Sequence, residues 1–475
     1  MTGVREGSSS DERRGRASME RPDLSPPGEV RRIVHTLEEA GFATWAVGGA
    51  VRDALAGRAP GDWDLTTAAR PTDVQRLFRR TVPVGIDHGT VGVLGRDRRL
   101  YEVTTFRRDV QTFGRRAVVA FSDTLEEDLE RRDFTINAVA WHPLTHEIRD
   151  PHGGRSDLAA GVLRTVGEPA RRFHEDRLRV LRALRFAGRF QLRIDSATWS
   201  AAVDIAPGLR ELSAERVREE LLKVLGELPR PSEALRLYAA SGALRELYPE
   251  LNACVGAEHD DGSGDLWDHL LRVTDAVPRH RVPLRLAALL HEVGRASSTE
   301  GEDATAGTSR LSDGADAAGA GAAIAREVLR RLKLSNAETD RVVHLIAHHE
   351  GFPPADASGA AIRHWLRIIG REYVHDLFRL RFAKCRVRDA DPASPAQASA
   401  VGLYRRVRQV LSEDPPLTIG ELAIGGAELR QLGLRPGPRY GKILRTLLER
   451  VLEDPALNTV DSLLGIVSEQ LESAE

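Results

Sequence analysis

Apolar and polar positions repeat with two different periods along the chain, and the change of period divides it. Between about residues 28 and 150, short alternating stretches typical of strands are interleaved with helical patterns. From about residue 192 onward, apolar residues recur almost everywhere at helical spacing. The pattern therefore predicts an α+β fold, with a strand-containing first part and a helical remainder.

The first elements surround a pair of glycines. A helix is predicted from about Pro27 to Ala40, a short strand over residues 42–47, and a second helix over residues 51–56. Between the strand and the second helix, Gly48-Gly49 forms a turn whose backbone N–H groups can hold phosphate oxygens. Arg52, one turn into the helix, can add a charged contact; the alternative is a tight turn with no ligand.

Two aspartates follow, separated by one residue. Asp62 and Asp64 would point to the same face of a strand, and Trp63 and Leu65 to the other. Two carboxylates this close repel each other unless they share a cation, and Mg²⁺ prefers carboxylate and phosphate oxygens. The pair is a candidate Mg²⁺ site; the alternative is a solvated surface.

A third carboxylate is a candidate on a later strand. After a helix-like stretch at residues 71–79, strands are predicted at residues 90–94 and 100–106. Glu102 and Thr104 share one face of the second strand. Glu102 is thus either a third acidic ligand or a polar residue on a half-buried strand.

A polar stretch at residues 109–122 is predicted to be a mobile loop. An acidic helix, the run Arg131-Arg132-Asp133 and a strand starting near Phe134 follow it. Arg132 is placed to reach a triphosphate, and the alternative is a surface ion pair.

Farther along, Asp176, Arg179, Arg182 and Arg185 recur every three residues in a single predicted helix. Spacing alone favours an amphipathic helix with a solvated basic face. Residues 295–322, rich in Ser, Asp, Gly and Ala, predict a flexible insertion, and residues 386–398 predict a further break between helices.

Composition limits the remaining choices. A length of 475 residues predicts about three domains. Cys254 and Cys385 form no C-x-x-C motif, which excludes a zinc ribbon and favours a reducing compartment. The sequence holds no apolar run long enough to cross a membrane, and residues 1–27 lack the apolar centre of a signal peptide and predict a disordered extension. A cytoplasmic protein is expected.

Four motifs occur in order: Gly48-Gly49-x-Val-Arg-Asp, Asp62-x-Asp64, the run from Arg131 to Asn137, and Glu175-Asp176-x-x-Arg179. With them the chain resembles the bacterial class II tRNA nucleotidyltransferases and poly(A) polymerases, CCA-adding enzymes most of all, from about residue 28 to 460. The resemblance implies a mixed-sheet nucleotidyltransferase head and an all-helical neck, body and tail. The corresponding ranges are 28–150 for the head, 151–250 for the neck with its nucleotide-selecting and RNA-binding helices, 251–400 for the body and 401–475 for the tail.

The resemblance also implies a role for each candidate residue. Asp62 and Asp64, joined by Glu102, would be the catalytic carboxylates, the first two as Mg²⁺ ligands. The nucleotide would be bound by Gly49, Arg52, Arg132, Asp176, Arg179, Arg182 and Arg185.

The chemistry of the base edge supports the last part of this assignment. Cytosine and adenine both present an exocyclic amine beside a ring-nitrogen acceptor. A carboxylate (Asp176) accepts from the amine and a guanidinium (Arg179) donates to the ring nitrogen. Uracil and guanine present a carbonyl where the amine should be, so one Asp–Arg pair selects CTP and ATP without a template. For this helix, the resemblance and the chemistry outweigh the solvated-face interpretation.

The predicted reaction is the template-independent addition of CCA to the 3′ end of tRNA from CTP and ATP, by two-metal nucleotidyl transfer. Backbone contacts to tRNA are predicted for a set of basic residues: Arg216, Arg218, Lys223, Arg230, Arg236, Arg439 and Lys442. The alternatives are a poly(A) polymerase, a partial enzyme adding only A or only CC, and a catalytically silent RNA-binding protein. The oligomeric state, monomer or homodimer, stays open.

The body contains many histidines. They resemble the HD phosphohydrolase domain of some family members: His269, His291-Glu292, His344, His348, His349 and Asp389. The HD dipeptide is His-Asp, and the longer Glu292 would displace its oxygen from the ligand position. We therefore expect a degenerate HD-like body; the alternative is an HD-type metal phosphohydrolase with an RNA-binding head.

Overall fold

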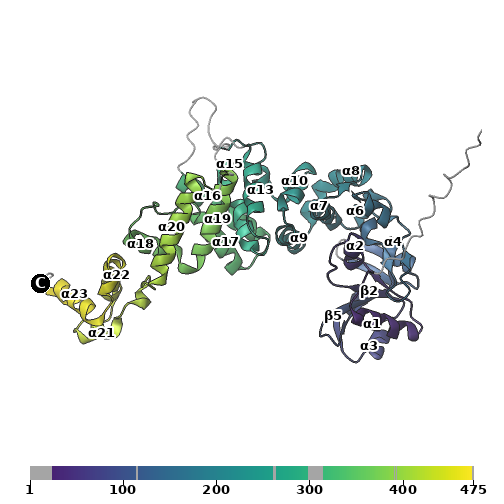
Figure 1. Cartoon of the computed structure of the whole chain (residues 1–475), viewed down its shortest axis with the longest axis horizontal. Helices are drawn as coiled ribbons and strands as arrows, with labels where there is room; N and C mark the ends of the chain where they lie inside the picture. The colour runs from purple at the N-terminus through teal and green to yellow at the C-terminus, as the bar shows by residue number, and fades with distance from the viewer. Residues whose placement is uncertain are drawn as a thin grey trace, which may run out of the picture. The chain divides into compact units, whose positions relative to one another are not determined.

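The computed structural model describes residues 24–113, 116–259, 264–297, 314–389, 391 and 393–472. They form two compact units (Figure 1). The first contains the chain up to Ala183 together with Gln191–Ile205, and the second contains Leu184–Phe190 and everything from Ala206 onward. Most of the predicted disordered extension, residues 1–23, lies outside the described residues.

The first unit is built on a seven-stranded sheet with the order β3-β4-β5-β2-β1-β8-β9. The strands are β1 (Thr44–Val47), β2 (Asp64–Thr67), β3 (Thr81–Gly85), β4 (Thr90–Leu94), β5 (Leu100–Thr105), β8 (Ala140–Trp141) and β9 (Ile148–Arg149). β2 and β5 run parallel, and the other neighbours are antiparallel. The predicted mixed sheet is confirmed; β3 and β9 have no counterpart among the predicted elements, and the strand predicted to start near Phe134 starts at Ala140, after a 3₁₀ turn.

The sheet has an apolar face on each side, because side chains alternate along its central strands. Ala46 and Leu65 pack in one core with the buried residues of α1, whereas Trp45 and Val47 pack in another with Leu125 of α4. The helices of this unit are α1 (Gly28–Glu39), α2 (Gly49–Leu55), α3 (Pro71–Leu77), α4 (Leu125–Glu130), α5 (Gly154–Ala159), α6 (Pro169–Glu175), the first part of α7 (Leu178–Phe190) and α8 (Ser196–Ile205). Figure 1 shows α1 beside α3. The two cores fix the ends of β1 and β2.

The stretch predicted as a mobile loop is a β-hairpin instead. β6 (Arg107–Phe113) pairs with β7 (Arg116–Phe121) in a separate two-stranded antiparallel sheet. The prediction was wrong because it gave weight to the polar residues and to Gly114, which lies outside the described residues. The two flanking stretches both contain valine and phenylalanine, which favour strands.

The second unit is helical, as predicted (Figure 1). It contains the end of α7 and α9 (Ala214–Glu227), α10 (Pro231–Ala240), α11 (Ala243–Leu247), α12 (Pro249–Asn252), α13 (Leu266–Ala276), α14 (Val282–Leu290), α15 (Val293–Ser297), α16 (Gly314–Arg331), α17 (Asn336–His348), α18 (Gly359–Ile369), α19 (Val374–Arg388), α20 (Pro395–Ser412), α21 (Gly426–Gln431), α22 (Pro438–Glu453) and α23 (Val460–Glu472). None of the described helices combines the length and the apolar character that crossing a membrane requires.

Two predicted breaks are shorter than expected. The predicted insertion at 295–322 contains the end of α15 and the start of α16, which begins at Gly314 because its many alanines favour a helix. Residues 298–313 lie outside the described part of the chain. The break at 386–398 narrows to the six positions between Arg388 and Pro395.

Candidate active site

The two aspartates lie at the start of β2. Asp64 is the first residue of the strand and Asp62 precedes it, so only one of them belongs to the predicted strand. The alternation holds nevertheless, because Trp63 and Leu65 are buried while Asp62 and Asp64 are exposed. Both carboxylates therefore face away from the core.

Glu102 comes close to them through the pairing of two strands. β2 and β5 run parallel with Leu65 opposite Val103, and Glu102 is exposed between the buried Tyr101 and Val103. Asp62, Asp64 and Glu102 line one cavity of about 890 Å³. Of the two interpretations of Glu102, this arrangement favours an acidic ligand.

The electrostatics of Asp64 fit a cation site. Desolvation by the surrounding protein, followed by the neighbouring Glu102 and Asp62 carboxylates, raises the pKa of Asp64 to about 6; the Arg132 guanidinium acts in the opposite direction. A cation bound among these oxygens would relieve both the desolvation and the repulsion. The residues present therefore fit a divalent metal ion.

Gly48 is the residue just before α2, and it lies next to the Asp64 carboxylate. Its φ of +75° lies in the left-handed region, which strains other residues. A Cβ atom on Gly48 would lie 3.4 Å from Arg132 Nη1 and 3.6 Å from Asp64 Oδ2. Both are ordinary van der Waals distances, so the backbone conformation is what favours glycine here, and the guanidinium and the carboxylate lie beside the backbone next to Gly49, the first residue of α2.

Arg52 points into the protein rather than outward. It is buried, its Nε donates to Asp53 Oδ1 at 2.8 Å, and its Nη1 donates to the Asn137 side-chain oxygen at 2.7 Å. These bonds connect α2 to the 3₁₀ turn Thr135–Asn137. A direct phosphate contact by Arg52 stays a prediction, and its observed contacts support the turn.

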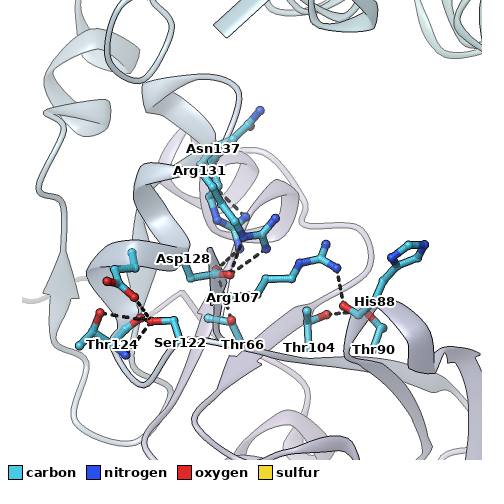
Figure 2. Close-up of polar contacts among 12 residues, drawn as sticks. Thr66, His88, Thr90, Thr104, Arg107, Ser122, Thr124, Asp128, Arg131 and Asn137 are labelled. Carbon is cyan, nitrogen blue, oxygen red and sulfur yellow. Dashed lines mark hydrogen bonds and ion pairs between the residues drawn. The ribbon is translucent and has the colours of Figure 1, made fainter. Parts of the chain in front are cut away.

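Asp128, which the sequence analysis did not single out, holds Arg132. Its fully buried carboxylate accepts from Arg132 Nη2 at 3.1 Å and from Arg131 Nη2 at 2.7 Å. Thr66 of β2 donates to it at 3.3 Å, and Figure 2 shows Asp128 between Thr66 and Arg131. Although burial opposes it, the two guanidiniums lower the pKa of Asp128. The spacing of three and four residues on an acidic helix was the available signal.

Asp133, the residue after Arg132, contacts the arginines of α7 for which the sequence predicted a role in nucleotide binding. Asp133 accepts from Arg182 Nε at 2.8 Å, and the backbone oxygen of Arg131 accepts from Arg179 Nη2 at 3.2 Å. Arg179 also pairs with Glu175 at 2.9 Å. The run from Arg131 to Asp133 therefore acts electrostatically on Asp64 through Arg132 and bonds Arg179 and Arg182 through the two neighbouring residues.

The helix expected to carry Asp176 and the three arginines is two helices. α6 ends at Glu175 and α7 starts at Leu178, with Asp176 in an extended conformation between them. The Asp176 carboxylate accepts from the Leu178 backbone N–H at 3.1 Å, so it caps α7 instead of lying on its face. A cap was missed because helical spacing continues across the break.

Arg185 has a different environment. It is buried, and its Nε donates to Glu220 Oε2 of α9 at 2.7 Å, with Glu227 3.4 Å from Nη1. Both partners belong to the helical unit. A direct nucleotide contact by Arg185 is a prediction that this pairing does not favour.

Several residues of the predicted RNA-binding set have protein partners. Lys223 pairs with Glu220 at 3.3 Å, Arg218 donates to the Lys333 backbone oxygen, and Arg236 pairs with Asp268. Arg439 and Lys442, at the start of α22, are exposed. These two are the predicted tRNA contacts of the tail, and both are accessible to a ligand.

Comparisons with known proteins agree with this geometry. Residues 44–164 match the family model described as the poly A polymerase head domain, and residues 191–255 match the one described as the probable RNA and SrmB-binding site of polymerase A. The acidic cavity thus lies in the part of the chain that is similar to a poly A polymerase head domain. Nucleotidyl transfer in general uses divalent metal ions.

The particular family follows from similarity over almost the whole chain. A CCA-adding enzyme of Levilactobacillus brevis is 31% identical over 447 residues, which are 93% of this chain and 97% of the relative. The chain therefore belongs to the CCA-adding enzyme family. A CCA-adding enzyme of Enterococcus faecalis is 45% identical over 42% of this chain, and the chain spans about half the length of this relative (48%).

Solved structures show the same architecture. The structure of a Bacillus stearothermophilus CCA-adding enzyme in complex with CTP superposes with a TM-score of 0.71 and 29% identity, covering 94% of this chain and 100% of that one. A Thermotoga maritima CCA-adding enzyme complexed with tRNA, at 19% identity and a TM-score of 0.53, shares the fold over 94% of this chain and 97% of that one.

Proposed function

We propose that this protein adds CCA to the 3′ end of tRNA from CTP and ATP without a template. One observation carries the proposal: Asp62, Asp64 and Glu102 line a single cavity, next to a glycine turn that Arg132 approaches. Acidic groups beside an arginine-lined phosphate position are what nucleotidyl transfer requires. Family membership supports the choice of CCA addition within this reaction class.

Mg²⁺ is the proposed metal ion. Asp62 and Asp64 would hold it, with Glu102 as the third carboxylate, because hard cations prefer carboxylate oxygens and substrate phosphates. When bound, the ion supplies Lewis-acid activation of the RNA 3′-hydroxyl and neutralisation of the triphosphate. The protein's own task is to hold the carboxylates close together in their charged form.

The remaining head residues orient the triphosphate. Arg132 is held by Asp128 so that its guanidinium lies beside Gly48, where it can neutralise charge that develops on the leaving pyrophosphate. Gly49 would offer its backbone N–H, and Arg52 supports the turn through Asn137. A guanidinium fixed in advance loses little entropy when the nucleotide binds.

Base selection is assigned to the junction of α6 and α7. Asp176 would accept from the exocyclic amine of cytosine or adenine, and Arg179 would donate to the ring nitrogen. Glu175 and the Arg131 backbone oxygen hold Arg179, while Asp133 holds Arg182. Because the same segment holds Arg132, base and phosphate recognition share one support.

The acceptor is proposed to be tRNA, bound through the backbone by basic residues such as Arg439 and Lys442. A cytoplasmic location, where tRNA and nucleoside triphosphates occur together, stays a prediction. Poly(A) addition, partial addition of A or CC, and an HD-type phosphohydrolase are the competing activities.

The deciding experiment supplies purified protein with tRNAs that end before the first C, before the second C, and before A. Each is incubated with Mg²⁺ and CTP, ATP, UTP or GTP, and the products are sized. The proposal expects single-nucleotide steps that stop after CCA, with no UTP or GTP incorporation. Long A-tails on unrelated RNA would establish poly(A) polymerase instead. Incorporation that survives the double change Asp62→Ala and Asp64→Ala would overturn the assignment of the site.

A further inference from the structure

The helical unit contains a second cavity, of about 820 Å³, at a cluster of histidines and acidic residues. It is lined by side chains of α13, α15, α19 and α20, of the segments just before α13 and α15, and of the segment that follows α17. Glu292, buried just before α15, is at the centre of the cluster: His259 lies 2.9 Å, His291 3.5 Å and His269 3.7 Å from its carboxylate oxygens. His344, His348 and Asp389, of the predicted HD-like set, are not among its described lining residues.

The cluster resembles a metal site but does not fit a metal ion. His259, His269 and Glu292 form one possible ligand group, and His291, Glu292 and His349 form another. The Lys384 ammonium, however, lies 2.8 Å from Glu292 Oε1 and also bonds Glu350. An ammonium only donates hydrogen bonds, and a metal ion next to it would meet a like charge. Lys384 takes the place of the cation.

Among the described residues, the lining of the same cavity has an excess of positive charge. Arg295, Arg381, Lys384 and Arg388 line it, against the two carboxylates that Lys384 already bridges. A bound anion would balance this excess.

Arg381 lies against the aromatic wall of this cavity. Its guanidinium lines the cavity and lies 4.5 Å from the centre of the Phe352 ring. Phosphate oxygens match the geometry of a guanidinium. The volume exceeds that of inorganic phosphate, and Phe352 gives a flat apolar wall.

We propose that this cavity binds a small phosphate-bearing ligand directly through Arg381 and its basic neighbours, without a metal ion. The chemical class is a phosphate monoester or a diphosphate anion. The site is separate from the carboxylate cavity of the head and does not depend on the reaction assigned there.

Cys385 gives a local measurement, because it lines the cavity whereas Cys254 is fully buried. The full-length protein is treated with iodoacetamide in EDTA, and the modification of each cysteine is followed by peptide mass. Millimolar pyrophosphate or AMP should slow the modification of Cys385 by about tenfold. Arg381→Ala should abolish this protection, and Arg386→Ala, an exposed arginine of the same helix outside the lining, should preserve it.

The two ligands distinguish the sources of the phosphate. Protection by pyrophosphate and AMP alike supports recognition of the phosphate alone, and stronger protection by AMP supports stacking against Phe352. No protection in the native protein, or equal protection in Arg381→Ala, would overturn the proposal.

Zinc content tests the statement that this cavity binds its ligand without a metal ion. It is measured in the double variant Asp62→Ala and Asp64→Ala, so that the head binds no zinc. After exposure to Zn²⁺ and desalting, no stoichiometric zinc is expected. Lys384→Met in the same background frees Glu292 Oε1 and should raise the bound zinc at least about tenfold. One equivalent of zinc with Lys384 intact, or protection of Cys385 only when a metal is added, would contradict the proposal.

Discussion

The head and the helical body both gather acidic groups around a cavity, but with opposite electrostatic results. In the head, Asp64 lies beside Glu102 and Asp62, and desolvation together with their repulsion raises its pKa to about 6. In the body, burial is outweighed by His291, His259 and Lys384, which lower the pKa of Glu292 well below its usual range. The first site needs a cation from outside, and the second contains its own.

The largest effect on nucleotide incorporation is expected from a change in the carboxylate cavity of the head. Asp64→Asn removes a carboxylate from the group of three and should lower nucleotide incorporation at least about 10³-fold. Because it also removes a repulsion, the melting temperature without metal should stay equal or rise by about 1–2 °C. Incorporation is measured with radiolabelled CTP and melting by calorimetry. The exposed Glu126→Gln is the control, and a severe loss of stability in Asp64→Asn would contradict the comparison.

Replacing Glu292 in the body should lower the free energy of unfolding of the helical unit and leave nucleotide incorporation unchanged. Glu292→Gln leaves Lys384 without its buried carboxylate, and removing one member of a buried pair costs about 3 kcal/mol. Urea denaturation of the helical unit measures this loss. Incorporation at 25 °C should stay within a factor of about two of the native protein. Glu413→Gln, at the exposed end of α20, should change neither quantity; equal urea midpoints for both variants would refute the prediction.

A smaller effect is expected from the pair that orients Arg132. Asp128→Asn weakens its bonds to Arg131 and Arg132, so the KM for CTP should rise about tenfold, more than kcat falls. Steady-state kinetics with a tRNA primer measure both constants. Asp123→Asn, an exposed carboxylate five residues earlier, serves as the matched control. An equal loss of kcat with unchanged KM would assign Asp128 a different role.

The smallest effect is the pH dependence, and its cause differs between the two cavities. The raised pKa of Asp64 means that its charged form is lost as pH falls through about 6, so incorporation at low Mg²⁺ should fall about fourfold between pH 7 and 5.5. The lowered pKa of Glu292 gives stability that is complete above its unfolded value of about 4.5 and is lost only below it. This carboxylate therefore adds no pH dependence over the same interval. The stability of the helical unit should nevertheless fall between pH 7 and 5.5, because burial lowers the pKa of His269 to about 3 and that of His291 to about 4, and the unfolded chain takes up protons there that the folded unit does not. Urea denaturation at the two pH values measures this loss, and equal midpoints would contradict it.

The sequence predicted the positions that depend on local pattern. The alternation around Trp63 placed Asp62 and Asp64 on one side, and the alternation of β5 placed Glu102 on the exposed face. Helical spacing predicted the all-helical remainder. These features depend on periods of two and 3.6 residues, which are visible in any short window.

Contacts between distant segments were not predictable in this way. Asp128 is identified as the support of Arg132 only when α4 packs beside Thr66, and the pairing of Arg185 with Glu220 joins residues 35 positions apart. Lys384 lies 92 positions from Glu292, and no local pattern connects them. Burial decides these roles, and burial depends on the whole fold.

The parallel pairing of β2 with β5 has a consequence for how this protein tolerates insertions and deletions. The carboxylates of Asp64 and Glu102 meet because the register places Leu65 opposite Val103. Residues can be gained or lost in the turn between β4 and β5 without changing that register. A single-residue deletion inside β5 shifts the register by one, so that Glu102 and Val103 exchange faces. The cavity then loses a carboxylate and the core loses an apolar side chain. In lineages of this protein, length variation should accumulate in the turn, and β5 should vary only by substitution.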